Sequence, residues 1–241
     1  VAASVDLGSN KQVLRLTGSN FVLVAINSIT ATFANTVNLD RAAAVVDSSL
    51  TDTKQAALAK YGFAQTDFSQ EWTVLPMGGG TTTDDPTLDL CNGKFASESD
   101  RLERRQVVVS KPRSPYAFLS SEVVRYSSVA AAQAAHKELV KVLAQCQADK
   151  GYTDATGALM PYTFAEIKNI PAGVMGEGSR VFVRATIDSG ANARQLLGFY
   201  QFNGAIFTGL YVMTASETVY TDAQVATWLQ VAATMASRLK G

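Results

Sequence analysis

Residues 180–214 read RVFVRATIDSGANARQLLGFYQFNGAIFTGLYVMT. The stretch holds three runs rich in β-branched and aromatic residues, which favour extended strands. The strands it predicts are 180–187, 195–202 and 205–214. Asn203-Gly204 separates the last two, and an Asn-Gly pair tolerates the positive φ that a type I′ hairpin turn requires. The stretch therefore predicts an antiparallel meander.

An amphipathic helix is predicted directly after the meander. Thr221 and Gln224 have the spacing of a capping box at its first turn. Arg238 and Lys240 near its last turn complement the negative end of the helix dipole. Apolar residues recur at spacings of three and four, as on the buried face of a helix. They are Val225, Trp228, Leu229, Ala232, Met235, Ala236 and Leu239.

A second group of elements is predicted upstream. Strands are expected at 106–110 and 117–126, followed by a long helix that Ser127 or Ser128 caps and that ends near Ala148. The apolar stripe predicted for this helix is Val129, Ala132, His136, Leu139, Val140, Leu143 and Cys146. An earlier helix at 53–61 would begin at the Asp52 cap and end at Gly62 in a left-handed conformation, with Phe63 folding back over its last turn. A further strand is expected to start near Trp72.

These elements predict an α+β fold, a twisted antiparallel sheet flanked by helices, with the long helices covering one face. Residues 49–241 would form this domain. Residues 1–48 would form a strand-rich N-terminal extension, with strands at 13–16 and 21–33 that pair with each other or pack on the domain.

The composition excludes several classes of protein. Of the 241 residues, 47% are hydrophobic and 17% charged, which is typical of a folded globular chain. The formal net charge is zero, whereas nucleic-acid binders and polybasic membrane-surface modules need a basic excess. No stretch reaches the length of about 20 apolar residues that spans a bilayer. Any secretion signal or lipid-attachment cysteine would lie upstream of Val1.

Cys91 and Cys146 are the only cysteines, 146 − 91 = 55 residues apart. Their even number and the lack of a Cys-x-x-Cys motif favour one structural disulfide over a redox site. Cys146 falls on the predicted apolar stripe, where a bridge to Cys91 is sterically reasonable. A disulfide implies an oxidising compartment, so an extracytoplasmic location is expected, either in the cell envelope or secreted.

His136 is the single histidine, so a catalytic triad or a histidine metal site would have to use it. It lies within the helical stripe and has no histidine or cysteine at ligand spacing, so we interpret it as a packed structural residue. A hydrolase that uses His136 remains the alternative. No catalytic residue and no cofactor are assigned.

Two loop features resemble ligand sites but lack their spacing. Gly78-Gly79-Gly80 lacks the Gly-Lys-Ser/Thr end of a phosphate-binding loop. The carboxylates of Asp84, Asp85 and Asp89 lack the twelve-residue calcium-loop pattern. We interpret both as surface loops and predict no metal site.

Basic residues gather between positions 101 and 125, interspersed with carboxylates. They are Arg101, Arg104, Arg105, Lys111, Arg113 and Arg125. One interpretation is an exposed surface of ion pairs, each worth little. The other is an anion-binding cleft with bidentate arginine contacts.

From about residue 50 onward the order of features is distinctive. A Phe68-Ser-Gln-Glu-Trp72-Thr-Val run precedes Cys91, two strands end at Tyr126, an Ala-rich helix closes on Cys146, and a meander and a terminal helix follow. This order resembles the actinobacterial envelope lipoproteins related to the extracellular sensor domain of the mycobacterial kinase PknH. The resemblance implies an antiparallel sheet flanked by helices, with a cleft for an unidentified ligand. PknH-type domains carry a second disulfide in the meander, and this chain has no cysteine after Cys146.

The first functional hypothesis is therefore an extracytoplasmic ligand-binding or sensor-type domain of a bacterial cell envelope, without catalysis. Its partner would be a small-molecule or envelope ligand, and it would meet the membrane only through an upstream anchor. The residues expected to line its cleft, from strand positions alone, are Arg125, Tyr126, Arg184 and Tyr200. The alternative is a structural or interaction protein that docks a partner through its N-terminal strands or its surface, because an unpaired strand edge can recruit another chain.

Overall fold

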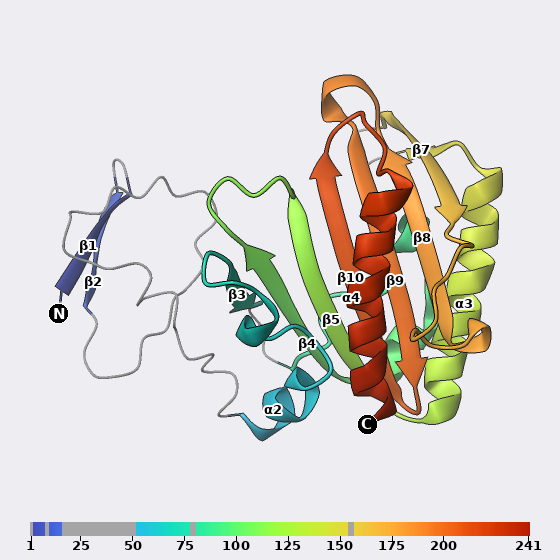
Figure 1. Ribbon diagram of the computed structural model, residues 1–241, viewed down its shortest axis with the longest axis horizontal. Coiled ribbons are helices and arrows are strands. Elements are labelled where there is room, and N and C mark those ends of the chain that lie inside the picture. Colours follow the sequence, from blue (N-terminus) through green and yellow to red (C-terminus); the bar gives the residue numbers. More distant parts are fainter. Residues whose placement is uncertain (1, 8–9, 16–51, 78–80, 154–156) are drawn as a thin grey trace.

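The computed structural model describes residues 2–7, 10–15, 52–77, 81–153 and 157–241. Within them an eight-stranded antiparallel sheet has the strand order β3-β4-β5-β10-β9-β8-β7-β6 (Figure 1). Its strands are β3 (Thr73–Pro76), β4 (Arg101–Ser110), β5 (Phe118–Tyr126), β6 (Gly151–Thr153), β7 (Leu159–Glu166), β8 (Arg180–Ile187), β9 (Arg194–Asn203) and β10 (Ile206–Ala215). The predicted α+β class is confirmed.

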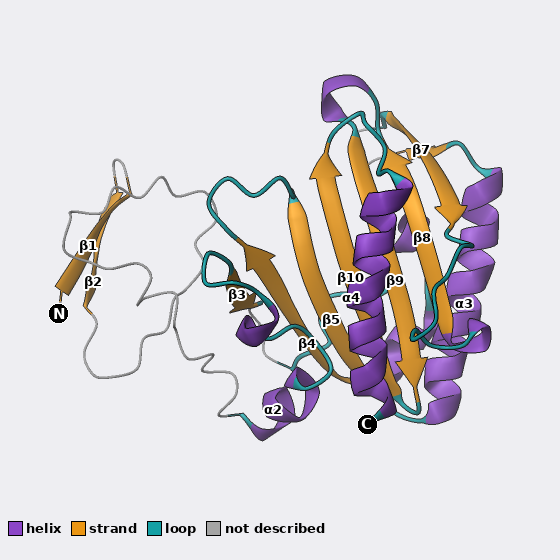
Figure 2. Cartoon of the chain, in the orientation of Figure 1, coloured by secondary structure: helices purple, strands orange, loops and turns teal. Residues whose placement is uncertain are grey.

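Two long helices, α3 (Val129–Ala148) and α4 (Asp222–Lys240), lie on opposite faces of this sheet (Figures 1 and 2). The expectation that they cover one face was wrong. The central strands are apolar on both sides. In β9, Tyr200 belongs to the core beneath α3 and Phe199 to the core beneath α4. Such strands read as nearly continuous apolar runs because neither face meets solvent.

The meander is confirmed as β8, β9 and β10, which pair antiparallel in sequence order. The turn between β9 and β10 differs from the prediction. Asn203 pairs with Ile206, so the two central turn residues are Gly204 and Ala205. Of these only Gly204 has positive φ, 58°, as the first central position of a type II′ turn requires.

α4 begins with the predicted capping box of Thr221 and Gln224, and its predicted apolar face is buried in full. The two basic residues at its end also donate hydrogen bonds to neighbouring loops. Arg238 donates hydrogen bonds to the Gly62 carbonyl and the Asp67 carboxylate, and Lys240 donates to the Gly173 carbonyl. They fasten loops from both halves of the chain to the end of α4.

Ser128, one of the two predicted cap residues, caps α3, and the helix ends at Ala148 as predicted. The predicted stripe is buried except at two positions. Val129 is 50% exposed and Val140 48% exposed, because they lie at the margin of the helix face that meets the sheet. β4 begins at Arg101, five residues before the predicted start, and the strands β6 and β7 were not predicted.

The first described helix is α2 (Thr53–Ala59), which Asp52 caps by accepting hydrogen bonds from the Lys54 and Gln55 amides. Gly62 lacks the predicted left-handed conformation, and Phe63 belongs to the core beneath α4. The short 3₁₀ turns are η2 (Gln65–Asp67), η3 (Leu90–Asn92), η4 (Ala96–Asp100), η5 (Glu177–Ser179) and η6 (Gly190–Asn192).

β1 (Ala2–Leu7) and β2 (Asn10–Arg15) form a separate two-stranded antiparallel sheet. The strand predicted at 13–16 overlaps the end of β2, while β1 was not predicted. The strand predicted at 21–33 lies outside the described residues.

Candidate functional site

A cavity of about 500 Å³ lies on the α3 side of the sheet. Its floor comes from β4, β5, β8, β9 and β10, and one wall is the 83–92 segment, which precedes η4. The polar side chains that line it are Thr87, Asp89, Asn92, Arg104, Gln106, Glu122, Tyr200 and Tyr211. The apolar and aromatic ones are Leu90, Phe118, Tyr152, Phe164, Ile187, Leu196 and Met213. The volume and the mixed lining are typical of small-molecule sites.

Glu122, in the middle of β5, is the most deeply placed charged group in this cavity, at 3% exposure. Its Oε1 accepts hydrogen bonds from Thr87 Oγ1 at 2.9 Å and from Arg104 Nε. Burial raises the pKa of Glu122 to about 7, against the lowering effect of Arg104 and Thr87, and the nearby Asp89 charge adds to the rise. A carboxyl that changes charge near neutral pH is typical of functional sites.

Two nitrogens of the Arg104 guanidinium donate hydrogen bonds to the chain itself. Nε donates to Glu122, and Nη2 donates to Gln106 Oε1 at 2.7 Å. Nη1 lies 3.7 Å from the Asp85 carboxylate, a distance of charge pairing without a hydrogen bond. These hydrogen bonds use two of the five N–H donors of the guanidinium, and carboxylates lie on two sides of its charge.

Arg101 and Glu98 hold the 83–92 segment against the sheet. Arg101 donates to the Thr83 carbonyl at 2.7 Å, the Asp85 carbonyl at 2.7 Å and Thr87 Oγ1 at 2.8 Å. The Glu98 carboxylate pairs with Arg101 at 3.0 Å and accepts hydrogen bonds from the Thr87 and Leu88 amides. These charge-assisted hydrogen bonds to backbone atoms fix the position of this wall of the cavity.

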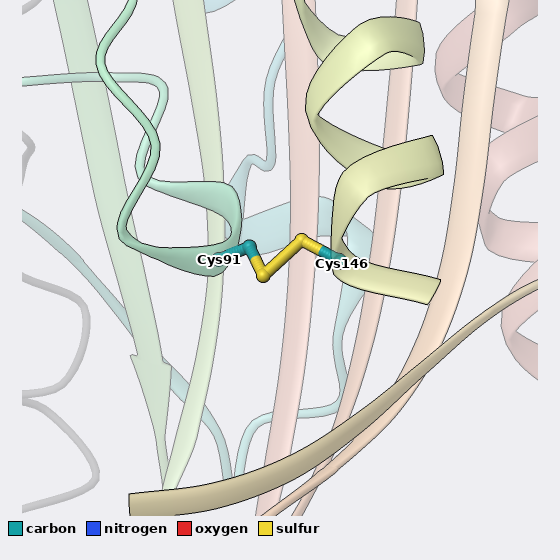
Figure 3. The surroundings of a disulfide bond; sticks show 2 residues. All are labelled: Cys91 and Cys146. Carbon is teal, nitrogen blue, oxygen red and sulfur yellow. A yellow bond between two sulfur atoms is a disulfide. The ribbon is translucent and has the colours of Figure 1, made fainter. Parts of the chain in front are cut away.

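The predicted disulfide between Cys91 and Cys146 is present and ties the same segment to the last turn of α3 (Figure 3). The two Cα atoms lie 6.0 Å apart, and Cys91 itself lines the cavity. Cys91 and Asn92 both have positive φ, 58° and 52°, which non-glycine residues adopt only at a cost. The covalent bond is one of the contacts that hold this turn in place.

Two tyrosines and two glycines shape the floor. The rings of Tyr200 and Tyr211 meet edge to face with centroids 5.6 Å apart. A Cβ on Gly209 would lie 2.6 Å from the Tyr211 hydroxyl, and a Cβ on Gly198 would lie 3.2 Å from the Tyr200 ring. The glycines therefore let both rings lie back over their own strands. Burial raises the pKa of both tyrosines well above the usual value, so they retain their hydroxyl protons.

The four residues predicted to line a cleft fall on both faces of the sheet. Tyr200 lines the cavity, and Tyr126 is buried in the same α3-side core, against Phe207. Arg125 has the opposite side-chain direction to Tyr126 and pairs with Glu103. Arg184 faces Asp222 at the start of α4. The structure thus brings together two of the four, and only Tyr200 reaches the cavity.

At its centre the basic cluster differs from the first interpretation. Arg101, Arg104 and Arg105 are buried, so they do not form an exposed ion-pair surface. Arg101 is bound to carbonyls and side-chain oxygens of the chain itself, while Arg104 lines the cavity and pairs there with Glu122. Their role is to build the cavity and its wall.

Sequence reasoning missed Glu122 and Tyr211. A signal existed for Glu122, because β5 places it on the same face as the buried residues Val124 and Tyr126. A carboxylate at such a position marks either a buried ion pair or a site. No sequence pattern around Thr87 or Asp89 indicates that their loop covers the sheet.

His136 is 9% exposed, packs near the Phe202 ring and has Nε2 3.0 Å from the Arg180 carbonyl oxygen. It does not line the cavity around Glu122. Of the three loop carboxylates, Asp89 lines that cavity, while Gly78-Gly79-Gly80 lies outside the described residues. Within the described ranges no group of three His, Cys, Asp or Glu side chains is arranged to hold a metal ion.

Comparison with solved structures gives a likeness of fold. The crystal structure of the extracellular domain of PknH from Mycobacterium tuberculosis matches with a TM-score of 0.52 and 15% sequence identity, over 77% of this chain and 96% of that chain. At that identity the likeness shows a shared fold, which confirms the structural part of the resemblance. No family model matches the chain, and no curated protein matches it. Among the helices that the structure describes, none has the length and apolar character needed to cross a membrane.

Proposed function

We propose that this chain is an extracytoplasmic sensor-type domain of a bacterial cell-envelope protein, and that it binds a small molecule in the cavity around Glu122. The shared fold with an extracellular kinase domain and the disulfide support the location. An actinobacterial lipoprotein, anchored through a segment upstream of Val1, is the envelope protein that the resemblance favours. The proposal assigns no catalysis and no nucleic-acid partner.

The observation that carries the proposal is a cavity of about 500 Å³ built around a buried charged pair. If only the stability of the fold mattered, apolar residues could replace the buried pair of Glu122 and Arg104 with little or no loss of stability. They lie instead on strands of a rigid sheet, facing an opening lined by aromatic rings. Rigid elements that present polar groups to a concave apolar surface are typical of ligand sites.

A thermal-shift screen against cell-envelope metabolites and small amphipathic molecules would test the proposal. The matched variant is Leu196→Trp, which fills the cavity, and the control is Leu102→Trp at a position 58% exposed. A true ligand is expected to raise the Tm of the parent protein and of the control by several degrees and to leave Leu196→Trp unchanged. A screen without any compound of that behaviour would refute the proposal.

One observation favours a second function, the docking of a partner. β1 and β2 pair with each other and take no place in the eight-stranded sheet. A two-stranded hairpin is marginally stable alone and offers two open edges to another chain. Deletion of residues 1–48 would abolish capture of an envelope partner if this function operates, and unchanged capture would argue against it.

A further inference from the structure

We propose that the cavity around Glu122 selects an amphipathic organic cation, with a protonated amine next to Glu122 and Asp89 and an apolar body that runs along β9 and β10. This inference rests on the proposed ligand-binding function and names the chemical class of its ligand. Four observations support it: the pairing of Arg104 with the chain's own acceptors, the spare acceptors of the site, the aromatic rings beside Glu122, and the division of the lining into a polar and an apolar end.

The main cation of the polar end is already paired with acceptors of the chain itself. Arg104 donates from Nε to Glu122 and from Nη2 to Gln106, and its Nη1 lies 3.7 Å from the Asp85 carboxylate. Thr87 Oγ1 donates to Glu122. An anionic head group would therefore find its obvious cationic partner engaged, and it would lie beside Glu122 and Asp89. A carboxylate or phosphate ligand is disfavoured by both effects.

The acceptors, in contrast, have capacity left. Both hydrogen bonds to Glu122 from the described residues reach Oε1, and none reaches Oε2. Asp89 adds a second carboxylate to the lining. Around the 83–92 segment the carboxylates of Asp85, Asp89, Glu98 and Glu122 outnumber the guanidinium groups of Arg101 and Arg104. A ligand head that donates hydrogen bonds and carries positive charge supplies what this end lacks.

The rings next to Glu122 add to this preference. Tyr200 is two strands from Glu122, level with it across Gly209, and Tyr211 follows on the same face. The negative face of an aromatic ring attracts a cation in a site that excludes water. Tyr152 and Phe164 widen the aromatic lining on the β6–β7 side.

The apolar end lies further along the same strands. Strand register places Phe118 opposite Met213, and Met213 opposite Leu196. All three line the cavity. Phe118 lies four residues along β5 from Glu122, which corresponds to about 13 Å at 3.3 Å per residue. An apolar body of about eight carbon atoms attached to the amine fits this length.

The test compares three octyl probes of equal chain length by isothermal titration calorimetry: octylamine, 1-octanol and octanoate. At about pH 8, above the pKa of Glu122, octylamine is expected to bind at least about tenfold more tightly than octanol, and octanoate not detectably. Glu122→Gln and Asp89→Asn should each reduce the preference for amine over alcohol. Asp89 is exposed and its side chain does not cap η3, so Asp89→Asn keeps the test informative if Glu122→Gln fails to fold. Glu71→Gln, on an exposed carboxylate far along the chain, is the charge-matched control.

The outcomes separate this inference from the proposed function. Equal binding of amine and alcohol, or tighter binding of octanoate, overturns the inference. If that binding is lost in Leu196→Trp, the cavity is still a ligand site and the proposed function stands. Absence of binding by all three probes also overturns the inference, and the proposed function then fails only if the wider screen yields no ligand either.

Discussion

Glu122 is a buried carboxylate within a β-sheet, opposite Gln106 on β4 and Gly209 on β10. Arginine and threonine partners satisfy one of its oxygens, yet desolvation still raises its pKa to about 7. A residue that is costly to bury and sits in a cavity is the main reason to assign a function to this fold.

The pH dependence of stability follows from this residue. Between about pH 4.5 and 7 the folded chain keeps the Glu122 proton while the unfolded chain has lost it, so the free energy of unfolding falls as the pH rises through this interval. The shift corresponds to about 3 kcal/mol. Urea unfolding at several pH values is expected to show this fall in the parent protein and its loss in Glu122→Gln. A slope that persists in Glu122→Gln would assign the effect to another group.

Gly209 is predicted to control the position of Tyr211. In Gly209→Ala the new methyl group would lie 2.6 Å from the present hydroxyl position, so the ring must move away from its strand and into the cavity. We expect a loss of stability of about 1–3 kcal/mol and weaker binding of any cavity ligand. The control is Gly178→Ala, where the methyl group meets no atom within 4 Å, and it should change neither quantity. Ligand affinity that survives Gly209→Ala would place the binding elsewhere.

At the scale of elements, one wall of the cavity is the 83–92 segment, a loop that three kinds of contact hold in place. Arg101 binds its carbonyls, Glu98 binds its amides, and Cys91 joins it to α3. The loop has no regular structure of its own before η3, so these contacts decide its position.

The disulfide is expected to stabilise this wall as well as the whole fold. Replacing both cysteines in Cys91→Ser/Cys146→Ser opens a 55-residue loop, which corresponds to about 4 kcal/mol of unfolding free energy in the chain-entropy model. Hydrogen exchange should become faster in the 83–92 segment while β9 and β10 remain protected. Unchanged exchange in that segment would mean that Arg101 and Glu98 alone hold it.

The sequence predicted elements well where a local pattern is strong. The meander, the capping box of α4 and the course of α3 follow from strand alternation, cap chemistry and helical spacing. β6 and β7 were missed because β7 alternates weakly and contains Pro161, a residue that usually argues against a strand interior. Pro161 pairs with Gly151 of β6 and lies just before Tyr162, where the pairing of β7 with β8 begins.

The candidate site was much less predictable than the fold. It is assembled from a loop near residue 87, two strands near 104 and 122, and two strands near 200 and 211. No local pattern states which of these strands are neighbours or which face α3 covers. Guesses based on strand positions alone therefore selected Arg125 and Arg184, which point to the α4 side.

At the scale of the whole molecule, the two cores lie on the two faces of one sheet, and among the residues whose burial the structure describes their members begin at Phe63. We therefore predict that a chain without residues 1–48 folds as a unit. Its thermal unfolding should remain a single transition with a Tm within a few degrees of that of the full chain. Loss of cooperative unfolding would show that the N-terminal extension is part of the domain.

The central place of β10 bears on how the chain reaches this structure. β10 pairs with β5 on one side and with β9 on the other, and Leu119 meets Val212 across 93 positions of sequence, since 212 − 119 = 93. The hairpin of β4 and β5 therefore keeps one open edge until β10, which begins 206 − 126 = 80 residues after the end of β5, has been synthesised. Contacts so distant in sequence form slowly. During folding this protein is thus expected to persist as an incomplete sheet, whose open edge exposes it to self-association.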